Sequence, residues 1–144
     1  MLNDQQPILA LDVGESRIGI AISDPTKTLA SPVKTIKTIN ALNEIIECID
    51  RNNASSILIG LPYLPSGLKG TQFKKTQTFI KEISSYTKIP IITIDERFST
   101  IEAKKKILES INLNKSKRSK KTIPKDLIDS ASATVILQSY LDNL

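Results

Sequence analysis

The chain has 144 residues, with 20 Lys and Arg against 15 Asp and Glu, one Cys and no His. This length suits one domain with its own apolar core, which we expect to span residues 1–144. The single Cys and the absence of His exclude disulfides within the chain, cysteine-rich zinc sites, Ser-His-Asp triads and histidine acid–base pairs. Any chemistry must therefore use carboxylates, lysines, hydroxyls or a bound metal.

The positive charge is concentrated in one part of the sequence. Residues 115–125 contain six basic residues and no acidic one, which leaves 14 basic residues against 15 acidic ones elsewhere. A mobile run of this kind gathers phosphates by displacing their counterions, although a run of lysines can also be no more than a solvated loop. We predict contacts with nucleic acid here, at Lys117, Arg118, Lys120 and Lys121.

The sequence shows no signal for export or membrane insertion. Its first residues lack the basic and then apolar layout of a signal peptide, and no apolar run approaches the roughly 20 residues of a membrane span. We therefore expect a cytoplasmic protein. Cys48 lies in an apolar helical pattern and is expected to be a buried, unreactive thiol.

Five segments have the composition of β-strands: residues 8–13, 18–23, 33–36, 56–61 and 91–94. The first two are separated by a short turn that begins with Gly14, which predicts a hairpin at the start of the sheet. The fourth is a continuous apolar run that ends at Pro62, a pattern typical of a buried parallel strand.

Four segments favour helices: residues 40–52, 71–86, 99–111 and a last helix from about residue 126. Ser99 and Glu102 have the spacing of a capping box, and the last helix is apolar on most sides and therefore expected to be largely buried. The order predicts an α/β fold: a mixed five-stranded sheet, with an antiparallel meander followed by parallel strands, flanked by helices.

Acidic residues interrupt apolar elements at three places, where an unpaired charge is costly unless something balances it. Asp12 lies near the end of the first strand, Asp95 and Glu96 end the last strand, and Asp129 lies in the last helix. Each has a purely structural alternative. Asp12 could accept hydrogen bonds from the turn amides, and Asp95 or Glu96 could form an ion pair with Arg97. Asp129 could simply interact favourably with the helix dipole. Because side chains alternate along a strand, only one of Asp95 and Glu96 is expected to enter a site.

Taken together, the three acids indicate a metal site. Two strand ends and a helix would supply the oxygen ligands that Mg²⁺ or Mn²⁺ prefers. Two such ions could support phosphodiester hydrolysis in a protein without histidine. Arg17 and Arg97 could orient phosphates through bidentate bonds, or could form surface salt bridges. Residues 62–70 could form a mobile loop that places Lys69 beside a nucleic-acid backbone, or an ordinary connection.

The ordered motifs of the chain closely resemble those of the YqgF family of bacterial proteins. The motifs that carry the resemblance are Leu11-Asp12-Val13-Gly14, Arg17-Ile18-Gly19, Ala21-Ile22-Ser23-Asp24, Ile59-Gly60-Leu61-Pro62, Asp95-Glu96-Arg97-Phe98-Ser99-Thr100 and Ile128-Asp129-Ser130-Ala131. The resemblance covers nearly the whole chain. It implies a ribonuclease H-like fold, a nuclease that matures the 5′ end of pre-16S ribosomal RNA or resolves Holliday junctions, and a catalytic metal site at Asp12, Glu96 and Asp129, with Asp95 as the reserve ligand.

The chain departs from the family pattern after Pro62. There the family usually has methionine-aspartate-glycine-threonine-glutamate-glycine, whereas this chain has Pro65-Ser66-Gly67-Leu68-Lys69-Gly70-Thr71-Gln72. Acidic residues are lost and a lysine is gained, so no role of those acids carries over. The Asp-Glu-Arg motif is followed by Phe98-Ser99-Thr100 where leucine-threonine-threonine is commoner.

Three function classes follow from these patterns. The favoured one is a metal-dependent nuclease that acts on precursor ribosomal RNA or a DNA junction, with ribosome precursors as partners. A non-catalytic RNA-binding assembly factor is the second, and a phosphotransferase the third, although its nucleotide site would need two such domains. Backbone contacts do not distinguish RNA from DNA, and the sequence leaves both a monomer and a homodimer open.

Overall fold

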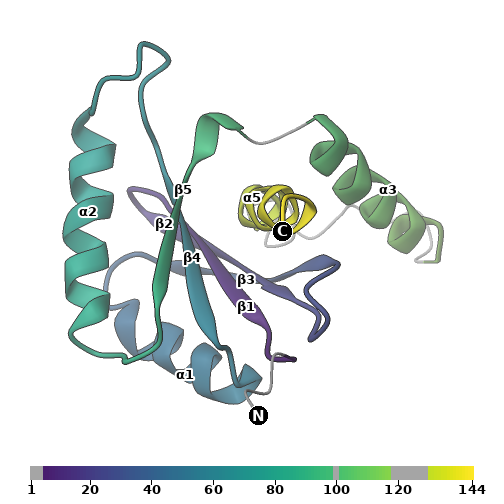
Figure 1. Ribbon diagram of the computed structural model, residues 1–144, viewed down its shortest axis with the longest axis horizontal. Helices are drawn as coiled ribbons and strands as arrows, with labels where there is room; N and C mark the ends of the chain where they lie inside the picture. The colour runs from purple at the N-terminus through teal and green to yellow at the C-terminus, as the bar shows by residue number, and fades with distance from the viewer. Residues whose placement is uncertain (1–4, 99–100, 118–129) are drawn as a thin grey trace.

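The computed structural model describes residues 5–98, 101–117 and 130–144, and its centre is a five-stranded mixed sheet (Figure 1). The strands are β1 Ile8–Val13, β2 Arg17–Ser23, β3 Ala30–Lys37, β4 Ser56–Leu61 and β5 Ile91–Asp95, in the spatial order β3-β2-β1-β4-β5. The first three pair antiparallel, and β4 pairs parallel with both β1 and β5. The predicted meander followed by parallel strands is confirmed.

The helices lie where the sequence favours them. They are α1 Leu42–Asn52, α2 Thr71–Ser84, the 3₁₀ turn η1 Glu96–Phe98, α3 Ile101–Lys117 and α5 Ala131–Asp142. The predicted end of the third helix near residue 111 is wrong, because α3 continues to Lys117. The first residues of the basic run contain no Gly or Pro that would stop it. The capping pair of the third helix and the predicted start of the last helix near residue 126 involve residues 99–100 and 118–129, outside the described ones.

Helices cover both faces of the sheet. Figure 1 shows α1 and α2 on one face and α5, with α3 beyond it, on the other. Alternation along β1 sends Leu9, Leu11 and Val13 into the core beneath α1 and α2, and Ile8 and Ala10 into the core beneath α5. The same alternation places residue 12 on the α5 face.

Two expectations about burial are confirmed. Cys48 is a free thiol in the core under α1, with 3% of its surface exposed, and burial raises its pKa. Helix α5 buries seven residues, as its apolar composition predicted. No helix in the described ranges is long and apolar enough to cross a bilayer.

Candidate active site

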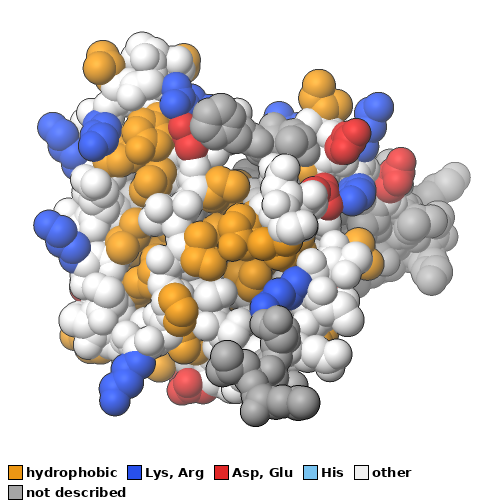
Figure 2. All heavy atoms as spheres, viewed as in Figure 1, with side chains coloured by type: hydrophobic (Ala, Val, Ile, Leu, Met, Phe, Trp, Pro, Cys, Tyr) orange, Lys and Arg blue, Asp and Glu red, His pale blue; other side chains and the backbone are white. Residues whose placement is uncertain are grey.

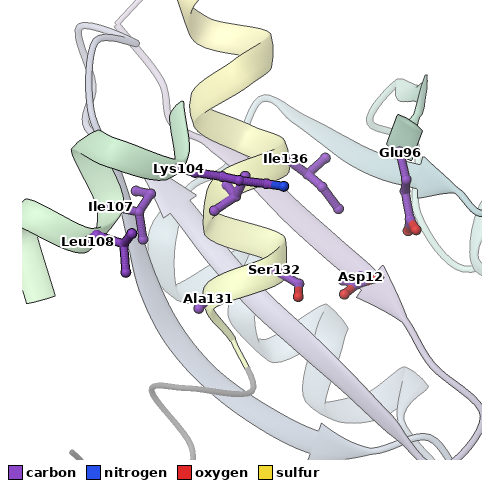
Figure 3. A pocket seen from close by; sticks show the side chains of 9 residues that line it. Asp12, Glu96, Lys104, Ile107, Leu108, Ala131, Ser132 and Ile136 are labelled. Carbon is purple, nitrogen blue, oxygen red and sulfur yellow. The ribbon is translucent and has the colours of Figure 1, made fainter. Parts of the chain in front are cut away.

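A pocket of about 450 Å³ opens between the sheet, α3 and α5 at the carboxyl end of β1 (Figure 3). Asp12 enters it from β1 and Glu96 from η1, directly after β5. The other residues that line it are Lys104, Ile107, Leu108, Ala131, Ser132, Val135 and Ile136. The two carboxylates that the sequence places at strand ends therefore meet in one open site, although 84 positions separate them in the sequence.

The Glu96 side chain occupies the space that a side chain at Gly60 would fill. Residue 60 lies on β4, the strand between β1 and β5, and pairs with Ile94. A Cβ added at Gly60 would lie 2.7 Å from both Cγ and Oε1 of Glu96, closer than real Cβ atoms approach their neighbours. A side chain at position 60 would thus push the Glu96 carboxylate out of its place.

Glu96 is partly buried and lies next to the negative charge of Asp12, and both facts disfavour its ionised form. Burial raises the pKa of Glu96 to about 8, with further contributions from the charge of Asp12, from the hydrogen bond with Asp12 and from the charge of Asp95. Two carboxylates this close cannot both be charged at neutral pH unless a proton or a cation lies between them. Hard oxygen donors that repel each other form a donor set that suits a divalent cation, so these two residues fit such an ion.

Asp95 does not line this pocket. Arg97 donates to its carboxylate from Nη2 at 2.7 Å, from Nε at 3.1 Å to each oxygen, and from the backbone N–H at 2.9 Å. These bonds hold the pKa of Asp95 below its usual value. Of these two neighbouring acids only Glu96 lines the pocket, and Asp95 forms the ion pair with Arg97 that is its structural alternative.

The sequence reasoning missed three residues at the site. Figure 3 shows Lys104 extending from α3 across α5, with its amine directed toward the side where Glu96 lies, and Ser132 on α5 near Asp12. Gln72, in the first turn of α2, donates from Nε2 to the Val13 carbonyl at 2.8 Å and so fixes the end of β1 next to Asp12. No sequence signal marked Lys104 or Ser132, because an exposed polar residue on a helix is ordinary. Gln72 could have been noticed as part of the altered loop.

Only some of the residues that are predicted to contact nucleic acid lie in the described part of the chain. Arg17 is exposed at the start of β2, Lys69 is exposed before α2, and Arg97 is exposed in η1. Lys117 is the last residue of α3, while Arg118, Lys120, Lys121 and the predicted third acid Asp129 lie outside the described residues. Within residues 5–98, 101–117 and 130–144, no three acidic, Cys or His side chains gather as a metal-binding group.

Known proteins share the sequence and the fold of this chain. Residues 6–143 match the model of the RuvX family, described as Holliday junction resolvase. A relative from Roseiflexus sp., provisionally named a pre-16S rRNA nuclease, is 35% identical over 146 residues, or 99% of each chain. One of the same name from Bartonella bacilliformis is 41% identical over 147 residues, which cover 99% of this chain and 86% of the relative.

Among solved structures, RuvC of Thermus thermophilus aligns with a TM-score of 0.58 at 10% identity over 96% of both chains. A fowlpox virus resolvase bound to Holliday junction DNA aligns with a TM-score of 0.50 at 19% identity, over 96% of this chain and 98% of the other. At these identities the likeness shows the fold alone, and it confirms the predicted ribonuclease H-like architecture. The match over nearly its whole length shows that the chain belongs to the RuvX family, the YqgF family that its motifs resemble.

Proposed function

We propose that this chain is a metal-dependent nuclease that hydrolyses phosphodiester bonds in structured nucleic acid and matures the 5′ end of pre-16S ribosomal RNA. The observation that carries the proposal is the pair of facing carboxylates, Asp12 and Glu96, in an open pocket. Membership of a family of nucleases supports the reaction type, and the names of the relatives support the RNA substrate. The site contains no histidine that could perform this chemistry instead.

Asp12, Glu96 and Asp129 would hold Mg²⁺ or Mn²⁺. Ala131 and Ser132 line the pocket, and Asp129 precedes Ala131 by only two positions, which supports its assignment as the third ligand. Bound divalent ions would supply activation of the attacking water and stabilisation of the departing oxygen. Glu96 is chosen over Asp95 because the Asp95 carboxylate is held by Arg97.

The cations of the chain would hold the substrate. Lys104 is the only cation among the residues that line the described pocket, and its amine would pair with a phosphate oxygen beside the two acids. Arg17, Lys69 and Arg97 would contact the backbone around the pocket. The basic run, through Lys117, Arg118, Lys120 and Lys121, would add the long-range attraction that gathers a polyanion.

The cellular setting follows from the proposed substrate. A nuclease for precursor ribosomal RNA would work in the cytoplasm on ribosome precursors, as a monomer or a homodimer. A second candidate substrate is the four-way DNA junction, favoured by the description of the family model as Holliday junction resolvase. A junction resolvase cuts paired strands and would need the homodimer.

The test is cleavage of labelled precursor ribosomal RNA and of a four-way DNA junction, in Mn²⁺ or EDTA. The proposal expects Asp12→Asn to bind both substrates and to cut neither, with a rate at least about 100-fold lower than that of the parent. Asp50→Asn is the matched control, since Asp50 is exposed on α1, across the sheet from the pocket. Binding without cutting by the parent protein would favour the assembly factor instead.

A further inference from the structure

The connection between β4 and α2, residues 62–70, projects beyond the carboxyl end of β4 (Figure 1), at the edge of the sheet where the parallel strands β1 and β5 also end. Its tip is apolar. Leu68 is 68% exposed and Leu64 is 45% exposed. Exposed apolar side chains do not stabilise the fold, and a group of them can mark a binding site. Figure 2 shows hydrophobic side chains on this projection, with Lys and Arg side chains just below it.

Hydrogen bonds within the connection hold its tip in one shape. The Leu64 N–H donates to the Leu68 carbonyl at 3.0 Å, and the Gly67 N–H donates to the Leu64 carbonyl at 2.8 Å. Gly67 has a φ of +86°, which a residue with a side chain would adopt only with strain. The two leucines are therefore displayed by a closed turn, which lowers the entropy lost when they contact a partner.

A stack of cations and aromatic rings supports the base of the tip. Lys69 lies over the Phe73 ring, 5.2 Å from its centroid, and the Phe73 and Tyr63 centroids are 4.6 Å apart. Arg97 lies over Tyr63 at 5.2 Å and is itself fixed by Asp95. Tyr63 thus contacts both Arg97 and Phe73 and is only partly exposed. The large apolar side chains that the connection leaves exposed are the two leucines.

This stack connects the tip to the acidic pair. Arg97 follows Glu96 in the sequence, and the same strand end that carries Gly60 leads into the projection. Lys69 supplies positive charge at the base of the tip, while the Arg97 side chain is 38% exposed beside it. A polyanion held by these cations would lie with its backbone across the pocket and its bases next to Leu64 and Leu68.

We propose that the tip formed by Leu64 and Leu68 is a wedge that contacts the face of an unstacked base beside the scissile phosphate. The inference rests on the proposed function and names its substrate class: nucleic acid in which helical stacking is interrupted at a branch, bulge or junction with a single strand. A continuous duplex offers the tip only sugar and phosphate, because every base face is covered by its neighbours. Apolar side chains, leucine among them, enter base steps in other nucleic-acid-binding proteins.

The experiment uses Asp12→Asn in EDTA, so that binding is measured without cutting. The probes are a four-way DNA junction with 2-aminopurine at the branch and a continuous duplex with the same base at its centre. Asp12→Asn, the parent protein of this experiment, is expected to raise the fluorescence of the junction only. Adding Leu68→Ser should remove most of that rise and weaken junction binding about tenfold, while duplex binding stays within about twofold.

Two further variants sharpen the result. Leu68→Met keeps an apolar tip and should keep the fluorescence rise, and Leu29→Ser removes a leucine of similar exposure, 58%, from the β2–β3 turn without effect. Equal losses with Leu68→Ser and Leu29→Ser, or no fluorescence rise with the parent, would overturn the wedge. The cleavage assay with Asp12→Asn decides the nuclease proposal separately, since it does not depend on where the bases lie.

Discussion

Among the residues that the structure describes, Glu96 has a pKa that differs strongly between the folded and the unfolded chain. Its pKa is about 8 in the fold against 4.5 as the ordinary value. Between these two pH values the folded state keeps a proton that the unfolded state has lost. The free energy of unfolding of the metal-free protein should therefore fall as pH rises from about 5 to about 8, by at most about 1.4 kcal/mol per pH unit.

Urea unfolding in EDTA across this pH range checks the prediction, with Glu96→Gln as the comparison. The variant cannot ionise at position 96 and should lose the slope. Asp24, Asp95 and Asp142 have lowered pKa values, so their stabilising effect is lost only as pH falls below their ordinary value of 3.8, outside the window. Parallel slopes in the two proteins would show that Glu96 is not held as the structure has it.

Gly60→Ala tests the geometry of the acidic pair without removing either acid. The new methyl group would meet Cγ and Oε1 of Glu96, and the flexible Glu96 side chain can move away more easily than the strand can. We expect a folded protein whose metal-dependent cleavage is at least about tenfold slower, because small displacements of reacting groups cost large factors in rate. Near-parent activity in the variant, with folding verified by circular dichroism, would show that the contact is not needed.

The residues of the candidate site were predictable to different extents. Asp12 could be identified because a charge inside an apolar strand pattern stands out in the sequence, whereas the choice of Glu96 over Asp95 came from the resemblance to the family. The role of Gly60 could not be identified, since it depends on a side chain that reaches over β4 from the end of β5. Lys104 and Ser132 were missed for a similar reason: nothing in a helical sequence tells which exposed position faces a pocket.

At the scale of elements, one of the buried polar side chains of α5, Gln138, joins this helix to the start of β3. Gln138 is fully buried; its Oε1 accepts from the Ala30 N–H at 2.9 Å, and its Nε2 donates to the Thr28 carbonyl at 3.0 Å. Through these bonds it joins α5 to the start of β3. An apolar residue here would leave a buried N–H without a partner, which costs more than the bond itself contributes.

Gln138→Leu is accordingly expected to lower the free energy of unfolding by about 2 to 4 kcal/mol. Gln138→Glu keeps the acceptor for Ala30, but it loses the donor for the Thr28 carbonyl and for Asp142 Oδ1 and brings a second carboxylate next to Asp142, so it should destabilise the fold as well. Equilibrium urea unfolding of the parent and both variants measures the effect. A loss below about 0.5 kcal/mol in the leucine variant would mean that water replaces the amide.

Hydrophobic patterns predicted the strands and helices because they follow burial. The continuous apolar run of β4 reflects its position between β1 and β5, covered on both faces. The ends were harder to predict. β3 begins at Ala30 and continues through Pro32, which lies on the edge strand where a missing N–H is tolerated. Helix α3 extends past residue 111 since lysine and serine do not end a helix as Gly or Pro would.

At the scale of the whole molecule, the uneven distribution of charge gives the last prediction. The chain is close to neutral apart from residues 115–125, so the affinity for a polyanion should depend on this run far more than on lysines elsewhere. Neutralising Arg118, Lys120 and Lys121 to Gln should weaken binding of precursor RNA and reduce the slope of log affinity against log salt by about 2 to 3.

The matched variant replaces Arg51, Lys81 and Lys88 with Gln. It also loses one Arg and two Lys, so both proteins change from a formal charge of +5 to +2, and all three of its positions are exposed, on α1, on α2 and between α2 and β5. If net charge alone attracted the nucleic acid, the slope of log affinity against log salt would fall by the same amount in both variants. If phosphates contact the basic run, the slope falls only in the first variant, because counterions are released only where phosphates make contact.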